Sequence, residues 1–325
     1  IYFLAKEGLL KRVLETGDKI NSKRLLVDTI KEAIPFILTG SAIQLFQILD
    51  QNTFINSMKW FSNYSNEDLI VMFSYFSANP NKITMILIAV ATSIGGVGIP
   101  LLTENYVKGD FRSAARLVQD NLSMPIFFIL PATIGAVLVA EPLYTVFYGK
   151  PDGLALGLFI FAMLQTIILS LYTVLAPMIQ ALFQNRKAII YFLYGVGVKL
   201  VLQVPLIYIF KAYGPLLATT VGLIIPILLM YQEIRKVTGL NPKNLFKRSL
   251  LSVILTVLMT IFVLVAELLI GLFLHPSGRI SSFVYITLIG GIGLAVYGGL
   301  ALKVRLMDRF IGSKAASLRR RFHIY

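Results

Sequence analysis

Polar side chains recur inside an otherwise apolar stretch near the start of the chain. Segment 33–56 contains Gln44, Gln47, Asp50 and Gln51, which follow one another at helical steps of three and four residues. Residues at this spacing share one side of a helix. On a membrane helix, such a side must face protein or water. The stripe predicts the wall of a hydrated cavity or a set of hydrogen bonds between helices, and the number of polar residues favours the cavity.

A single basic residue, Lys199, lies near the middle of a second apolar stretch, 188–210. A lysine at the centre of a membrane helix costs about 2.5–3.5 kcal/mol to insert. From that depth its side chain is too short to reach either membrane surface. We therefore expect Lys199 either to face a cavity or to pair with a carboxylate such as Asp50 or Glu267, and the sequence gives both equal weight.

A further basic residue, Lys82, stands at the outer start of segment 82–103, close to Asn79 and Asn81. It is expected either to anchor this helix end or to point into a central opening. Extension of the side chain to the membrane surface is by itself sufficient to account for its position. The substrate-cavity candidates are Gln44, Gln47, Asp50, Gln51, Lys82 and Lys199.

Side chains that bind metals or act as nucleophiles are scarce. The chain has no cysteine, and its two histidines, His275 and His323, are far apart in sequence. Disulfides and thiolate chemistry are therefore excluded, and little remains for a metal site or a catalytic triad. Gly95, Gly96 and Gly98 do not form a nucleotide loop, because no strand precedes them and no Lys-Ser/Thr follows. We predict no cofactor, no metal, no catalytic residue and no enzymatic activity.

The elements that position these residues are membrane helices. Hydrophobic residues make up 57% of the 325 positions and charged residues only 14%, too few to cover a soluble domain. The apolar runs are long enough to cross a hydrocarbon core, which takes about 20 helical residues. We predict an all-α polytopic membrane bundle of about eight transmembrane helices. These are 33–56, 82–103, 121–140, 155–183, 188–210, 213–232, 249–274 and 283–305.

The net charge of +14 indicates orientation rather than nucleic-acid binding. Lys and Arg residues lie between the apolar runs and not on one domain face. Most of the 30 basic residues fall on one side if both ends of the chain are cytoplasmic, as the positive-inside rule requires. The expected location is a membrane that the chain crosses several times, with membrane lipids as partners.

Five segments follow from this arrangement. They are a cytoplasmic connector with the end of an upstream helix (1–32), a six-helix lobe (33–232), a basic loop (233–248), two additional helices (249–305) and a basic tail that meets lipid headgroups (306–325). Between helices, 57–81 is expected to form an interfacial helix or a loop, and 104–120 an amphipathic connecting helix.

The sequence also resembles a known family. The resemblance is carried by IKEAIPFILTGSAIQLFQILDQNTF and by the stretch from ATSIGGVGIPLLTENYVKGDF to AEPLYTVFYG, with the core Gln47 to Gln51, Ile99-Pro100 and Gly109-Asp110. These pieces are similar to the polysaccharide biosynthesis/lipid II flippase family (MurJ/SpoVB/YtgP type) of the multidrug/oligosaccharidyl-lipid/polysaccharide exporter superfamily.

The resemblance implies a fourteen-helix protein with two six-helix lobes around a central cavity and two extra helices. The eight spans would be the seventh to fourteenth, and the missing N-terminal lobe of the same protein would be a partner. The pair within 249–305 would form a groove for the lipid tail. The family uses basic residues on its first two helices and on its eighth for the pyrophosphate. On 82–103, which corresponds to the eighth, Lys82 is the one basic candidate near the polar outer end.

The function expected from residues and resemblance together is transport. The leading hypothesis is flipping of an undecaprenyl-pyrophosphate-linked saccharide, the peptidoglycan precursor lipid II, by alternating access. One alternative is a cation-coupled multidrug antiporter of the same superfamily, which needs a buried carboxylate such as Asp50 or Glu267. A second is a membrane enzyme acting on lipid-linked sugars, for which the outer loop offers only Glu67 and Asp68.

Overall fold

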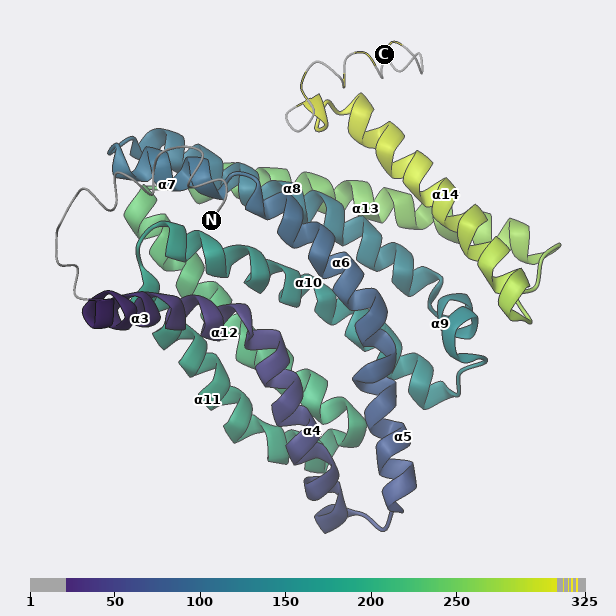
Figure 1. Ribbon diagram of the computed structural model, residues 1–325. Coiled ribbons are helices and arrows are strands. Elements are labelled where there is room, and N and C mark those ends of the chain that lie inside the picture. Colours follow the sequence, from purple (N-terminus) through teal and green to yellow (C-terminus); the bar gives the residue numbers. More distant parts are fainter. Residues whose placement is uncertain (1–21, 309–311, 313–314, 316, 318–319, 321–325) are drawn as a thin grey trace, which may run out of the picture.

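The fold is a bundle of helices in the computed structural model, which describes residues 22–308 and the single positions 312, 315, 317 and 320 (Figure 1). The elements are α3 (Ser22–Gly40), α4 (Ala42–Phe61), α5 (Asn66–Phe76), α6 (Ala78–Gly96), α7 (Ile99–Val107), α8 (Phe111–Leu138), α9 (Ala140–Tyr148), α10 (Gly153–Ala181), α11 (Asn185–Phe210), η1 (Lys211–Tyr213), α12 (Gly214–Thr238), α13 (Pro242–Gly271) and α14 (Arg279–Lys303). Within that part of the chain there are no strands, and the predicted all-α class is confirmed. Residues 1–21, His323 and most of the basic tail lie outside the described residues.

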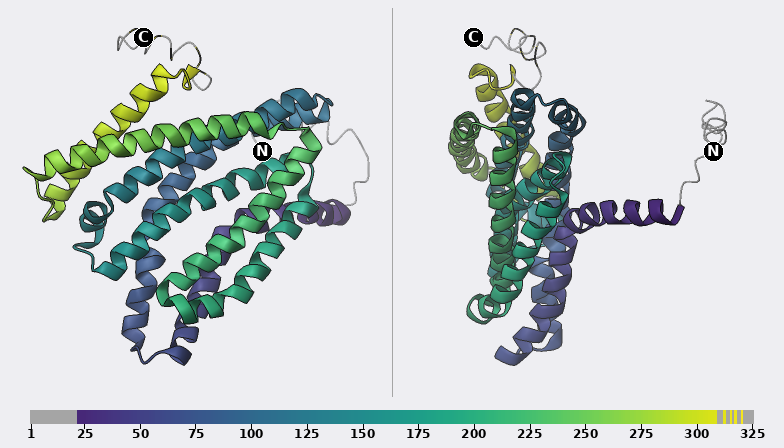
Figure 2. Two further views of the ribbon diagram at one scale, coloured as in Figure 1. Left: turned by 180° about the vertical axis from the view of Figure 1, so that it is seen from behind. Right: turned by 90° about the vertical axis from the view of Figure 1, so that its left-hand side faces the viewer.

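Six helical stretches of the described chain are long and apolar enough to cross a membrane, and the bent pair α3 and α4 adds a seventh. One of the six, Asn185–Thr238, has 54 residues and would measure about 81 Å if straight. That length far exceeds a hydrocarbon core of about 30 Å. The stretch instead turns back at η1, so that α11 and α12 pack side by side (Figures 1 and 2). With this hairpin counted as two crossings, the helices correspond to the eight predicted spans.

The first predicted span, 33–56, is bent rather than straight. Helices α3 and α4 meet at an angle of 60° around Ser41. Gln180 of α10 donates hydrogen bonds to the Pro35 carbonyl and to Thr39 Oγ1, which holds the last turn of α3 against the bundle. The earlier turns of α3 project away from it (Figure 2).

The connections between helices are shorter than predicted. Segment 57–81 contains the short helix α5, which continues almost directly into α6. Segment 104–120 is divided by a turn at Gly109, whose φ is +76°, and Asp110 then caps α8. The expected loop 233–248 consists mainly of the last turns of α12 and the first turns of α13. Hydropathy marks only the part of a helix that lies in lipid, whereas the polar end turns remain helical.

Helices α13 and α14 form the pair predicted for 249–305 and pack against α8 and α9. Their contact is apolar, with Val263 and Met259 next to Gly293, where an added Cβ would lie 3.3 Å from Val263. The Tyr297 hydroxyl donates a 2.7 Å hydrogen bond to the Phe127 carbonyl on α8. The pair is therefore attached to the six-helix lobe at one edge, visible at the right of Figure 1.

Candidate functional site

A small cavity opens between α4, α6, α10 and α12. Its polar lining consists of Gln47, Asp50, Ser77, Asn81, Thr84, Gln165 and Thr219. The cavity volume is about 50 Å³, and one water needs about 10–15 Å³ on this kind of measure. The cavity therefore has room for a few waters but not for a sugar.

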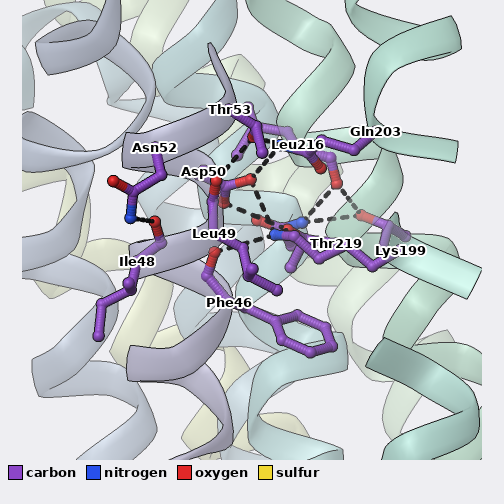
Figure 3. Close-up of polar contacts among 12 residues, drawn as sticks. Phe46, Ile48, Leu49, Asp50, Asn52, Thr53, Lys199, Gln203, Leu216 and Thr219 are labelled. Atoms are coloured by element: carbon purple, nitrogen blue, oxygen red, sulfur yellow. Dashed lines mark hydrogen bonds and ion pairs between the residues drawn. The ribbon is translucent and has the colours of Figure 1, made fainter. Parts of the chain in front are cut away.

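At the wall of this cavity, Asp50 forms an ion pair with Lys199 (Figure 3). Lys199 Nζ lies 2.8 Å from Asp50 Oδ1, and the two side chains are 0% and 11% exposed. The ammonium also donates to Thr219 Oγ1 and to the Phe46 carbonyl, at 2.5 and 3.1 Å. Gln203 donates to Asp50 Oδ1 at 2.7 Å. Of the two predicted environments for Lys199, the structure shows the ion pair with Asp50, and the lysine does not line the cavity.

Two glycines bring the partners of this ion pair together. Helices α11 and α12 approach so closely that a Cβ on Gly195 would lie 2.4 Å from the Gly222 carbonyl oxygen. Lys199 follows Gly195 by about one helical turn, and Thr219 precedes Gly222 by about one turn. The close crossing therefore places Lys199 against Thr219. A lysine with this many partners recovers part of the cost of leaving water.

The predicted polar stripe on α4 is divided between two sides of the helix. Asp50 is buried, whereas Gln44 and Gln51 are exposed. Gln44 and Gln51 lie nearly in line, and Asp50 is about 120° around the helix from Gln44. Gln47 lies between the two sides, lines the cavity and donates a 3.1 Å hydrogen bond to Asn81. Asp50 therefore does not share one polar side with Gln44 and Gln51, because successive steps of three residues drift around a helix.

Lys82 lies at the exposed start of α6 and does not line the cavity. Its Nζ is 5.2 Å from the centroid of the Tyr148 ring, close enough for a cation–π contact. The neighbouring Asn79 donates a 2.8 Å hydrogen bond to the Tyr144 hydroxyl. The structure thus brings Asp50 and Lys199 together and leaves Gln44, Gln51 and Lys82 on the outer surface.

Two members of the buried cluster, Gln203 and Thr219, were missed by the sequence interpretation. Gln203 carried a usable signal, because it follows Lys199 by four residues and must share its side of α11. Thr219 carried none, since threonine is ordinary in membrane helices and its role depends on where α12 crosses α11.

Comparison with known proteins shows which family the chain belongs to. The family model described as "Lipid II flippase MurJ" matches residues 1–288. The chain belongs to this family. Within the lipid II flippase family, a Bacillus subtilis (strain 168) protein described as "Lipid II flippase MurJ" is 28% identical over 322 residues. The match covers 97% of this chain and 59% of that relative, so the chain spans about three fifths of the relative's length. No solved structure gives a significant match.

Membership in the lipid II flippase family confirms the resemblance, and the apolar helices show a multi-pass membrane protein. The antiporter alternative relied on Asp50 or Glu267 as a free carboxylate. Asp50 is already paired with the Lys199 ammonium, so it offers no unoccupied negative charge to a cationic drug. This ion pair removes Asp50 from the antiporter alternative and leaves Glu267, which forms no ion pair among the described residues. Family membership favours the flippase hypothesis.

Proposed function

We propose that the protein containing this chain carries lipid II, an undecaprenyl-pyrophosphate-linked saccharide, across the bacterial plasma membrane by alternating access. Family membership over residues 1–288 carries the proposal. Its role is transport and not catalysis. The distribution of basic residues supports an orientation with both ends of this chain in the cytoplasm.

The substrate path runs along the outer polar surface of α4 and α6. The buried cavity is too small for a saccharide, and its one ion pair is satisfied within the lobe. By contrast, Gln44, Gln51 and Lys82 are exposed, and exposed polar groups on membrane helices must face protein or a water-filled space. An N-terminal lobe of the same protein would complete the opposite wall of this path.

The lipid tail is assigned to the pair α13 and α14. Large apolar side chains on this pair are strongly exposed, among them Leu268 (74%), Leu294 (76%) and Ile280 (82%). Such surfaces suit hydrocarbon contact. The assignment predicts that acyl-chain photocrosslinkers on the substrate label α13 and α14.

Translocation of labelled lipid II into vesicles by the reconstituted full-length protein tests the path. Lys82→Gln removes the one basic side chain on it, and we expect the rate to fall about tenfold, the usual value of one hydrogen bond to a charged group. Lys211→Gln is the matched control, because Lys211 also lies over a tyrosine ring, that of Tyr64, at 6.0 Å. Equal rates for both variants and the wild type would remove Lys82 from the path.

A further inference from the structure

A second, larger cavity lies at the end of the bundle where α8 and α13 begin and α12 ends. Its volume is about 780 Å³. Nothing in the transport path above involves it. It is lined by Phe111, Arg112, Ala115, Arg116, Gln119, Thr238, Gly239, Asn241 and Asn244.

The lining is basic and rich in amides, and it contains no acidic side chain. Arg112 and Arg116 are exposed and lie one helical turn apart on α8. Neither arginine belongs to an ion pair among the described residues. Of the nearby carboxylates, Asp120 pairs with Arg248. Asp110 accepts from the Ser113 amide and attracts Arg116 without forming an ion pair with it.

One amide side chain that lines this cavity forms no hydrogen bond within the described chain. Gln119 is only 7% exposed, lines the cavity and forms no side-chain hydrogen bond within the described chain. Its amide atoms are not fully buried, so they are accessible from the cavity. Gln119 is therefore placed to donate to a group that enters the cavity.

The position of the cavity across the membrane indicates which chemical group could enter it. Helix α8 has 28 residues and is about 42 Å long, whereas the hydrocarbon core is about 30 Å thick. Its first turns, which carry Arg112 and Arg116, extend into the headgroup layer. Phe111 also lines the cavity and is 50% exposed, which provides an apolar contact beside the charges.

We propose that this cavity binds the phosphate group of an anionic phospholipid. Arg112 and Arg116 neutralise the phosphate, and planar guanidinium groups match its oxygens. Gln119 and Asn244 provide amide donors at its sides, and Phe111 contacts the apolar part of the lipid. Because the lining comes from α8 and from the α12–α13 junction, a bound headgroup links the six-helix lobe to the α13–α14 pair.

The test compares two charge-matched variants of the full-length protein in detergent. Arg112→Gln/Arg116→Gln removes the positive charges at the second and sixth positions of α8. Lys243→Gln/Lys247→Gln removes the positive charges at the same two positions of α13. Both lysines are exposed and outside the cavity lining. Binding of phosphatidylglycerol, with phosphatidylcholine as reference, is measured by native mass spectrometry and by the shift in Tm.

We expect the arginine variant to bind phosphatidylglycerol at least tenfold more weakly and the lysine variant to bind within about twofold of the wild type, since two charge-assisted contacts are lost only in the former. Equal weakening in both variants would show a general basic surface and overturn the site. Unchanged binding in both would overturn it as well.

Two further measurements separate the sources of phosphate and test the Gln119 amide. Gln119→Glu keeps the size of the side chain but adds a negative charge, and we expect it to weaken phosphatidylglycerol binding as much as the arginine variant does, with unchanged Tm in the absence of lipid. Inorganic phosphate at millimolar concentration should neither raise Tm nor displace the lipid. Displacement by phosphate, or full binding by Gln119→Glu, would overturn the phospholipid assignment.

Discussion

The two sides of helix α4 carry the same kinds of polar residue in different surroundings. On the inner side, Asp50 contacts Lys199, Thr219 and Gln203, and almost none of its surface is exposed. On the outer side, Gln44 and Gln51 are exposed. The inner side is part of what holds the lobe together, whereas Gln44 and Gln51 form no side-chain hydrogen bond within the described chain and lie on the side that we propose for the substrate path.

This difference shows that a polar group in a membrane helix has to be assigned by its partners. The inner cluster joins α4, α11 and α12, so substitutions in it should lower the stability of the protein. Gln44 and Gln51 form no side-chain hydrogen bonds within the described chain, so substitutions there should change the transport rate and leave the stability nearly unchanged.

The largest loss of stability is expected for Lys199→Met. It leaves Asp50 as an uncompensated buried charge, and breaking a buried pair in this way costs about 3–5 kcal/mol. Tm of the full-length protein in detergent should fall sharply, and Lys82→Met should leave it nearly unchanged. Adding Asp50→Asn to Lys199→Met should restore much of the loss, because both charges are then absent. No recovery in the double variant would show that the lysine acts through packing and not through its pair.

A smaller loss is expected for Gly195→Ala. The new Cβ would lie 2.4 Å from the Gly222 carbonyl oxygen, so α11 and α12 must separate. Overpacking of this kind costs about 1–3 kcal/mol, and the separation should also weaken the contact between Lys199 and Thr219. Gly197→Ala is the control, since its Cβ meets nothing within 4 Å. Equal Tm values for the two variants would contradict the close crossing.

Much of the fold was predictable because membrane helices have a strong hydropathy signal. The eight spans and the candidate pair Lys199 and Asp50 followed from composition and from the cost of a charge in lipid. The bend at Ser41 and the short α12–α13 turn did not follow, because hydropathy is insensitive to helix direction and to polar helical ends. The choice between cavity and ion pair for Lys199 depended on the Gly195–Gly222 crossing, which is a property of two helices and not of one sequence segment.

An exposed carboxylate, Asp110, provides a contrast with the buried Asp50. Its side chain accepts a hydrogen bond from the Ser113 backbone amide at the start of α8, and this bond holds the pKa of the Asp110 carboxyl below its usual value. A lowered folded-state pKa means that the stabilisation is present above the unfolded pKa, about 3.9, and is lost as the pH falls through the folded value. Asp110→Ala should therefore lower Tm slightly at pH 7 and not at strongly acidic pH. Asp110→Asn keeps the capping acceptor and should show a smaller loss without that pH dependence.

The smallest change in stability is expected for Gln44→Leu/Gln51→Leu on the outer side of α4. Both side chains are exposed, and surface substitutions of this kind usually change stability by no more than about 0.5 kcal/mol. Transport should nevertheless fall, because two leucines place apolar surface where a hydrated saccharide must pass. Ile48→Leu, at an exposed position between them, is the control for crowding. A double variant with wild-type transport would show that the outer side of α4 faces lipid or a static contact, and the contrast between the two sides of this helix would then have no functional meaning.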